Sequence, residues 1–157
     1  MSRTADKTSS QPASAYGEDI RRLFSSAVRA LSDGEPLRAQ GLLSALLSQA
    51  PDHPMALHLA GVVALQQNKR SEALPLIEQS VAIDPRNPAS QCDLGFVLTS
   101  TGRLQEAEVH LREALRLKPA FPEAQLNLGN LLRQTGRRAE AEHAYAQAIG
   151  LRPKFAE

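Results

Sequence analysis

The side chains best suited to catalysis or metal binding are few and scattered in this sequence of 157 residues. Its four histidines are His53, His58, His110 and His143. No two of them stand at the i, i+4 spacing that places two metal ligands on one helix face. The single cysteine, Cys92, excludes an internal disulfide and the usual zinc-ligand sets made within one chain. A reactive thiol needs a positive neighbourhood, whereas the next residue is Asp93. We therefore expect no catalytic residue, no metal and no cofactor.

Two asparagines, Asn127 and Asn130, stand in the run NLGNLL at residues 127–132. A side-chain amide carries both donors and an acceptor. On an open surface, such amides can hydrogen-bond the backbone of an extended peptide without reading its sequence. The alternative interpretation is that both are ordinary exposed polar residues. The choice between them depends on the elements that position the two side chains.

Those elements belong to an internal repeat of 34 residues, which is best established before any other feature. One proline column is formed by Pro51, Pro85, Pro119 and Pro153. A second is formed by Pro54, Pro88 and Pro122. A glycine column follows at Gly61, Gly95 and Gly129. The first prolines are expected to end a helix, and the second to lie in the first turn of the next helix, where the missing N–H is harmless.

Each repeat is predicted to contain two amphipathic helices, which residues 122–134 and 139–151 illustrate. Their apolar stripes are Ala124, Leu128, Leu131 and Leu132 in the first helix, and Ala141, Tyr145, Ala148 and Ile149 in the second. Gly136 between them is expected to adopt the left-handed conformation of a helix C-cap. The same column holds Gly34, Asn68 and Gly102. The interior glycines are expected to face alanines twelve residues later: Ala73, Ala107 and Ala141.

The frame divides the chain into a flexible leader (1–16), a degenerate unit (17–53) and three regular units (54–87, 88–121 and 122–155), within one repeat domain. Lysine and arginine number 18 against 17 acidic residues, so the net charge is +1. This balance disfavours nucleic acid and anionic membranes as partners, because both require clustered positive charge. The sequence holds neither a membrane-spanning apolar run nor a secretory signal, so a cytoplasmic location is the expectation.

The recurring columns carry a family resemblance. Leu94, Gly95, Ala107, Ala114 and Pro119, with Leu128, Gly129, Ala141, Ala148 and Pro153 one repeat later, resemble the tetratricopeptide repeat. The resemblance covers about residues 54–155 well and 20–53 more weakly, where Ala27 replaces the glycine. It implies an all-α fold, a right-handed superhelix of antiparallel helix pairs (an α-solenoid). The run NLGNLL is similar to repeats of O-GlcNAc transferases and related bacterial proteins of the family, in which such asparagines form a ladder.

In this family the first helix of each pair lines a concave wall, on which extended partners bind. The resemblance therefore implies a set of binding candidates: His58, Leu59, Val62, Asp93, Phe96, Asn127, Asn130, Arg133 and Gln134. Thr99 and Ser100 are expected on the same face. The asparagine ladder is incomplete, because Asp93 and Phe96 occupy its columns one unit earlier.

The leading hypothesis is a non-catalytic scaffold that binds a protein or an extended peptide through this wall. One alternative is the N-terminal arm of a larger enzyme of the glycosyltransferase or sulfotransferase type, because the sequence stops at KFAE, where a further unit would begin. Another is a homodimer formed through an uncapped last helix, near Tyr145 and Ile149. RNA binding ranks lower, since the related RNA-binding arrays favour a 35-residue period and a basic wall.

Overall fold

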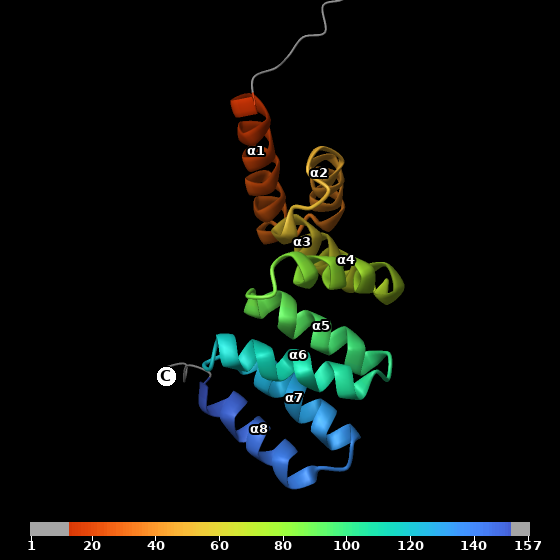
Figure 1. Cartoon of the computed structure of the whole chain (residues 1–157), viewed down its shortest axis with the longest axis vertical. Coiled ribbons are helices and arrows are strands. Elements are labelled where there is room, and N and C mark those ends of the chain that lie inside the picture. The colour runs from red at the N-terminus through yellow and green to blue at the C-terminus, as the bar shows by residue number, and fades with distance from the viewer. Residues whose placement is uncertain (1–12, 152–157) are drawn as a thin grey trace, which may run out of the picture. The chain divides into compact units, whose positions relative to one another are not determined.

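The computed structural model describes residues 13–151, and their side chains from residue 17 onward. Within this range the chain forms eight α-helices and no strand (Figure 1). The helices are α1 (Ala13–Ser32), α2 (Pro36–Gln49), α3 (Pro54–Gln66), α4 (Arg70–Ile83), α5 (Pro88–Ser100), α6 (Leu104–Leu117), α7 (Pro122–Gln134) and α8 (Arg138–Leu151). The two helices predicted for the last unit, 122–134 and 139–151, match α7 and α8 within one residue.

The chain divides into two compact units, with the boundary in the sequence between Pro51 and Asp52. The N-terminal unit contains α1 and α2, which pack on each other through Ala27, Ala30, Ala39, Leu43 and Leu46, all nearly inaccessible to solvent. The expected leader lies outside the described residues except for residues 13–16, which belong to the first turn of α1.

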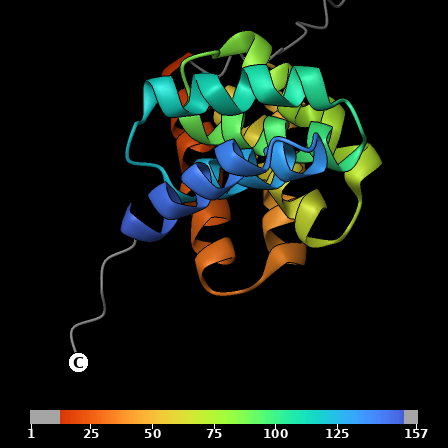
Figure 2. The same cartoon turned by 90° about the horizontal axis from the view of Figure 1, so that it is seen from below.

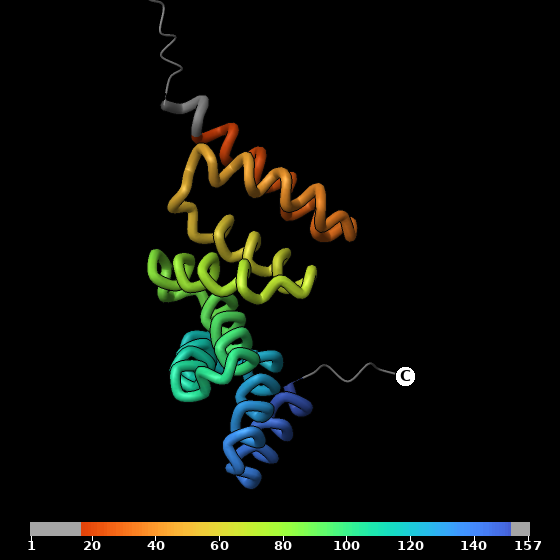
Figure 3. Tube along the Cα trace, turned by 90° about the vertical axis from the view of Figure 1, so that its right-hand side faces the viewer, coloured from red at the N-terminus to blue at the C-terminus, as the bar shows by residue number. Residues whose placement is uncertain are grey.

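The C-terminal unit contains three helix pairs, α3/α4, α5/α6 and α7/α8. Successive pairs are joined by contacts of α4 with α5 and of α6 with α7, and α5 also contacts α7 directly. The chain reverses after each helix, so neighbours in sequence are antiparallel (Figure 3). In the view from below, α7 and α8 of the last pair lie side by side (Figure 2). This arrangement is an all-α solenoid, as predicted.

The second proline column marks where the first helix of each pair begins. Pro54, Pro88 and Pro122 each occupy the first helical position, where a backbone N–H would have no intrahelical partner. The residue before α5 caps it directly, since Asn87 Oδ1 accepts from the backbone N–H groups of Ala89 and Ser90 at 3.0 and 3.3 Å. The proline thus starts the helix in the expected frame.

The turns within the pairs adopt the predicted left-handed cap. Gly102 and Gly136 both have φ of +80°, and Asn68 holds the same conformation with φ of +62°. In the turn after α5, the N–H of Arg103 donates to the carbonyl of Leu98 at 2.9 Å. This bond, five residues back along the chain, is that of a Schellman motif and satisfies a carbonyl that the helix end would leave unpaired. The same bond recurs after α3 and α7.

The interior glycines pack differently from the prediction. A Cβ on Gly95 would lie 2.5 Å from Leu111 Cγ, and one on Gly129 would lie 2.5 Å from the ring of Tyr145. Gly61 faces Ile77 in the same way. The main neighbour is therefore a large side chain sixteen residues later. The nearest atom of Ala107, the alanine twelve residues after Gly95, is its carbonyl oxygen, 3.2 Å from the position of such a Cβ. Each glycine makes room for a bulky residue of the second helix.

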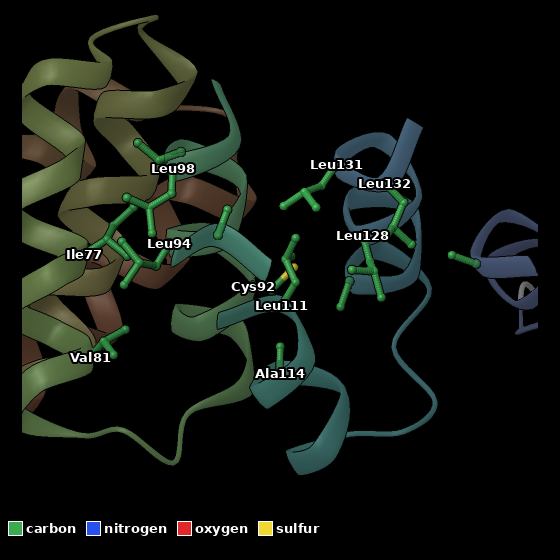
Figure 4. Close-up of a cluster of buried hydrophobic side chains, with 14 of the residues drawn as sticks. Ile77, Val81, Cys92, Leu94, Leu98, Leu111, Ala114, Leu128, Leu131 and Leu132 are labelled. Atoms are coloured by element: carbon green, nitrogen blue, oxygen red, sulfur yellow. The ribbon is translucent and has the colours of Figure 1, made fainter. Parts of the chain in front are cut away.

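Buried leucines and alanines connect the three pairs into one core (Figure 4). The apolar stripe predicted for α7 is buried throughout, with Leu131 fully inaccessible. On α8 the prediction of a buried stripe was wrong at one position, because Ile149 is 72% exposed. Ala144, which was not part of the predicted stripe, is buried. None of the described helices is long and apolar enough to cross a membrane.

Candidate functional site

A shallow groove of about 180 Å³ runs between α5 and α7 of the C-terminal unit. Its lining consists of Phe96, Thr99 and Ser100 from α5 and Asn127, Asn130 and Gln134 from α7. All six were predicted from the sequence to share one face. The groove exists because α5 and α7, which α6 separates in sequence, contact each other directly. The structure therefore gathers four of the nine predicted binding residues into one lining.

The two asparagines of the groove are held in complementary orientations. Asn127 donates from Nδ2 to the sulfur of Cys92 at 3.4 Å, which leaves its Oδ1 as an acceptor. Asn130 accepts at Oδ1 from the hydroxyl of Tyr145 at 2.9 Å, which leaves its amide N–H groups as donors. One asparagine thus presents an acceptor and the other presents donors. A peptide group needs this pair of partners, because it carries one N–H and one C=O.

The α5 side of the groove presents an aromatic ring. Phe96 is 40% exposed although it is one of the largest apolar side chains in the unit. The neighbouring hydroxyls bond within their own helix, since Thr99 donates to the carbonyl of Gly95 at 2.8 Å and Ser100 donates to that of Val97 at 2.7 Å. These bonds satisfy the hydroxyl hydrogens, so Phe96 dominates this wall as an apolar contact.

The remaining predicted residues lie outside the lining. His58 is 6% exposed, and its Nε2 lies 2.8 Å from Oδ2 of Asp93, to which it donates. Leu59 and Val62 are half-buried on α3, and Arg133 is exposed on α7. His58 Nδ1 is buried and has no hydrogen-bond partner among the described residues. His58 is therefore buried against Asp93, whose own side chain stays 32% exposed.

The His58–Asp93 and Cys92–Asn127 contacts occupy the same positions in successive repeats. Each joins the first helices of neighbouring pairs, and each spans 35 residues, one more than the repeat period. This register was not predicted, although the sequence indicates it. His58 and Cys92 share one repeat column, and Asp93 and Asn127 share the column next to it. One bond links α3 to α5, and the other links α5 to α7.

Cys92 has the properties of a packing residue. Its side chain is 2% exposed within the core. Burial, reinforced by the negative charges of Asp93 and Glu123, raises the pKa of the thiol to about 12 despite the hydrogen bond from Asn127. The thiol therefore stays protonated at neutral pH and is a poor nucleophile. The described residues contain no group of three histidine, cysteine or acidic side chains that can hold a metal ion.

A second pocket of about 430 Å³ lies among α6, α7 and α8, and the sequence reasoning missed it. It shares no lining residue with the groove. The sequence does contain a sign of this pocket: in one repeat column the large residues Leu76 and His110 are followed by the much smaller Ala144.

The fold defines a class of protein: a repeat solenoid of the kind that typically serves as a non-catalytic scaffold for protein interactions. Two family profiles, both described as tetratricopeptide repeat, match residues 24–88 and 98–157. The chain belongs to the tetratricopeptide-repeat family. No curated protein matches the sequence significantly.

Solved structures of several other proteins have a similar fold. MamA from Desulfovibrio magneticus superposes with a TM-score of 0.73 at 22% identity, over 84% of this chain and 75% of that one. YrrB, described as a tetratricopeptide-repeat protein with an unusual peptide-binding site, gives 0.73 at 17% identity, over 87% and 70%. A mutant O-GlcNAc transferase from Thermobaculum terrenum gives 0.70 at 30% identity, over 74% of this chain but only 22% of the enzyme.

Proposed function

We propose that the groove between α5 and α7 binds an extended peptide segment of a protein partner. The observation that carries the proposal is the orientation of the two amides. Asn127 presents an acceptor and Asn130 presents donors, each held in place by a bond to a neighbouring side chain. An extended peptide presents alternating N–H and C=O groups along its edge. The groove can therefore hold a peptide backbone at both kinds of group.

The composition of the lining indicates which peptides suit it. Its six residues carry no charge, so the groove offers nothing specific to an acidic or a basic side chain. The exposed ring of Phe96 offers apolar contact to one peptide side chain. We therefore expect an uncharged peptide segment with an apolar residue placed over Phe96, bound chiefly through its backbone.

The test begins with a phage-displayed library of linear peptides of about twelve residues, selected against the whole chain. The affinity of a selected, fluorescein-labelled peptide is then measured by fluorescence polarisation. Replacing Asn127 or Asn130 by alanine is expected to weaken binding by about five- to tenfold each, since a hydrogen bond contributes about 1 kcal/mol. The matched control is Gln79→Ala, which removes an exposed amide from α4. Selected peptides that bind both asparagine variants with unchanged affinity would refute the proposal.

Self-association is a second candidate, favoured by apolar side chains of the last pair. Leu126 is 37% exposed, whereas Cys92 in the same column is 2% exposed. Ile149 is 72% exposed, whereas Val81 in its column is 8% exposed. A second copy that packs on these side chains would cover them. Light scattering over a range of concentrations tests this: a dimer that Ile149→Glu converts into a monomer supports it, and a monomer at every concentration rejects it.

The same groove also suits the role of an arm within a larger enzyme. The 30% identity to part of an O-GlcNAc transferase supports the role of an arm in an enzyme of that type. An immunoblot of native cells distinguishes an enzyme arm from a separate scaffold protein, because an arm would be detected in a polypeptide far heavier than 17.0 kDa.

A further inference from the structure

The pocket among α6, α7 and α8 has an apolar floor and an amide at its edge. Leu115 from α6 and Leu128 and Leu132 from α7 supply the apolar floor, and the side chain of Gln125 supplies the amide. Ala144 of α8 also lines the space. A volume of about 430 Å³ with mainly apolar walls and a few polar groups falls within the range typical of ligand pockets.

The equivalent space one repeat earlier is occupied by a side chain of the protein itself. His110, 34 residues before Ala144, places Nδ1 at 2.7 Å from Oε1 of Gln91, which is 34 residues before Gln125. Gln91 is 4% exposed, and its Nε2 donates to the carbonyl of Pro85 at 2.8 Å. Its Oε1 is therefore the atom left to accept, and His110 Nδ1 carries the hydrogen. An imidazole N–H thus bonds a glutamine amide.

The imidazole in the middle repeat is neutral at neutral pH. Burial lowers the pKa of His110, and the opposing charges of Glu106 and Glu78 do not reverse this effect. The space around this amide therefore accommodates an uncharged ring with one N–H donor. In the last repeat the walls are kept, since Leu128 and Leu132 repeat Leu94 and Leu98. The ring of His110 has no counterpart at its own position, because alanine occupies its column, although His143 of α8 lines the pocket where the preceding repeat has Val109.

Arg112 and Glu140, two charged residues that line the pocket, are already paired within the protein. Arg112 donates to Glu108 at 2.7 Å, and Glu140 accepts from Arg137 at 2.6 Å. Neither rim charge therefore requires a counter-ion from a ligand. This balance favours a neutral occupant over an acidic or a basic one.

We propose that this pocket is a second docking site, which takes a histidine side chain of a partner protein, with the ring N–H donating to the amide oxygen of Gln125. The site is independent of the groove between α5 and α7, with which it shares no residue. A partner that engages both would be held by its backbone in the groove and by one imidazole ring in the pocket.

The experiment is a titration of the ¹⁵N-labelled chain with imidazole and with N-acetyl-histidine methylamide, followed by two-dimensional NMR at about pH 8, where both rings are neutral. Saturable shifts are expected for backbone amides around Gln125 and Ala144, with Kd on the order of millimolar for imidazole, because it has only a few atoms to contribute. N-methylimidazole, which lacks the N–H, should bind at least about fivefold more weakly.

Three variants make the test specific. Ala144→His supplies the ring from the chain itself and Ala144→Leu fills the space with an apolar group, so both should abolish the shifts while far-UV circular dichroism stays unchanged. Gln125→Leu keeps the volume but removes the acceptor, and should weaken imidazole binding about fivefold or more. The proposal is overturned if wild type shows no saturable shift, if Ala144→His responds like wild type, or if N-methylimidazole binds as tightly as imidazole.

Discussion

Replacing Gly95 by alanine tests whether the close approach of α5 and α6 depends on the absence of a side chain. A Cβ at this position would lie 2.5 Å from Cγ and 2.8 Å from Cδ2 of Leu111, and 3.2 Å from the carbonyl oxygen of Ala107. Leu111 is completely buried, so its side chain cannot swing into solvent to relieve the overlap. The two helices must therefore move apart, or Leu111 must leave its preferred rotamer.

Two opposing effects set the magnitude. Alanine is favoured over glycine in a helix interior by about 1 kcal/mol. Overpacking a buried site costs roughly 1–3 kcal/mol, and the upper half of that range applies here because both a side chain and a backbone oxygen are too close. The net expectation for Gly95→Ala is a loss of about 1–2 kcal/mol in the free energy of unfolding. Intrinsic propensity alone predicts the opposite sign.

Urea denaturation followed by circular dichroism measures this change, and two further variants identify its cause. Gly41→Ala is the matched control, because Gly41 lies inside α2 and a Cβ there would meet nothing within 4 Å. It should stabilise its helix by up to about 1 kcal/mol. In a Leu111→Ala background, which itself costs about 2–5 kcal/mol, Gly95→Ala should become stabilising. If Gly95→Ala raises stability in the wild-type background, the packing argument is wrong.

Three further predictions concern single positions. The pKa of the Cys92 thiol is raised to about 12 from an ordinary value of 9.0, so the thiol loses its proton on unfolding at alkaline pH. The free energy of unfolding should therefore keep its full value below pH 9 and fall between pH 9 and 12 by up to about 1.4 kcal/mol per pH unit. Urea titrations should show a smaller slope for Cys92→Ala. Gly102→Ala should cost about 1–2 kcal/mol, because φ of +80° forces a Cβ into the left-handed region; an unchanged melting temperature would contradict this. Asn87→Ala should cost about 1 kcal/mol in the same assay, since it removes the acceptor of two backbone N–H groups at the start of α5, whereas Asn87→Gly should cost only a few tenths.

The helix frame was readable from the sequence because its signals are local. Proline cannot donate a backbone hydrogen bond, so Pro54, Pro88 and Pro122 mark the first turn of α3, α5 and α7. Positive φ excludes most side chains, so Gly102 and Asn68 identify the turns. Neither inference requires knowledge of what each helix packs against, and each signal occurs in several successive repeats.

The membership of the groove was also predictable, since residues three and four apart share a helix face. Phe96, Asn127, Asn130 and Gln134 follow from that spacing together with the family resemblance. The burial of His58 against Asp93 was not predicted. It depends on how far α3 and α5 are shifted along each other, because that shift decides which residue columns lie side by side. The repeat length of 34 does not specify the shift.

Tertiary packing alone decided the features that depend on side-chain volume across helices. The sequence showed that small residues recur, but only the structure shows that Gly95 makes room for Leu111 rather than for Ala107. It likewise leaves Ile149 exposed and opens a pocket where Ala144 follows His110 in its column. Backbone conformation is dictated residue by residue, so the sequence by itself determined the repeat, the helices and the turns. Contacts between helices depend on which side chains meet at a fixed distance, and that is settled only when the chain is folded.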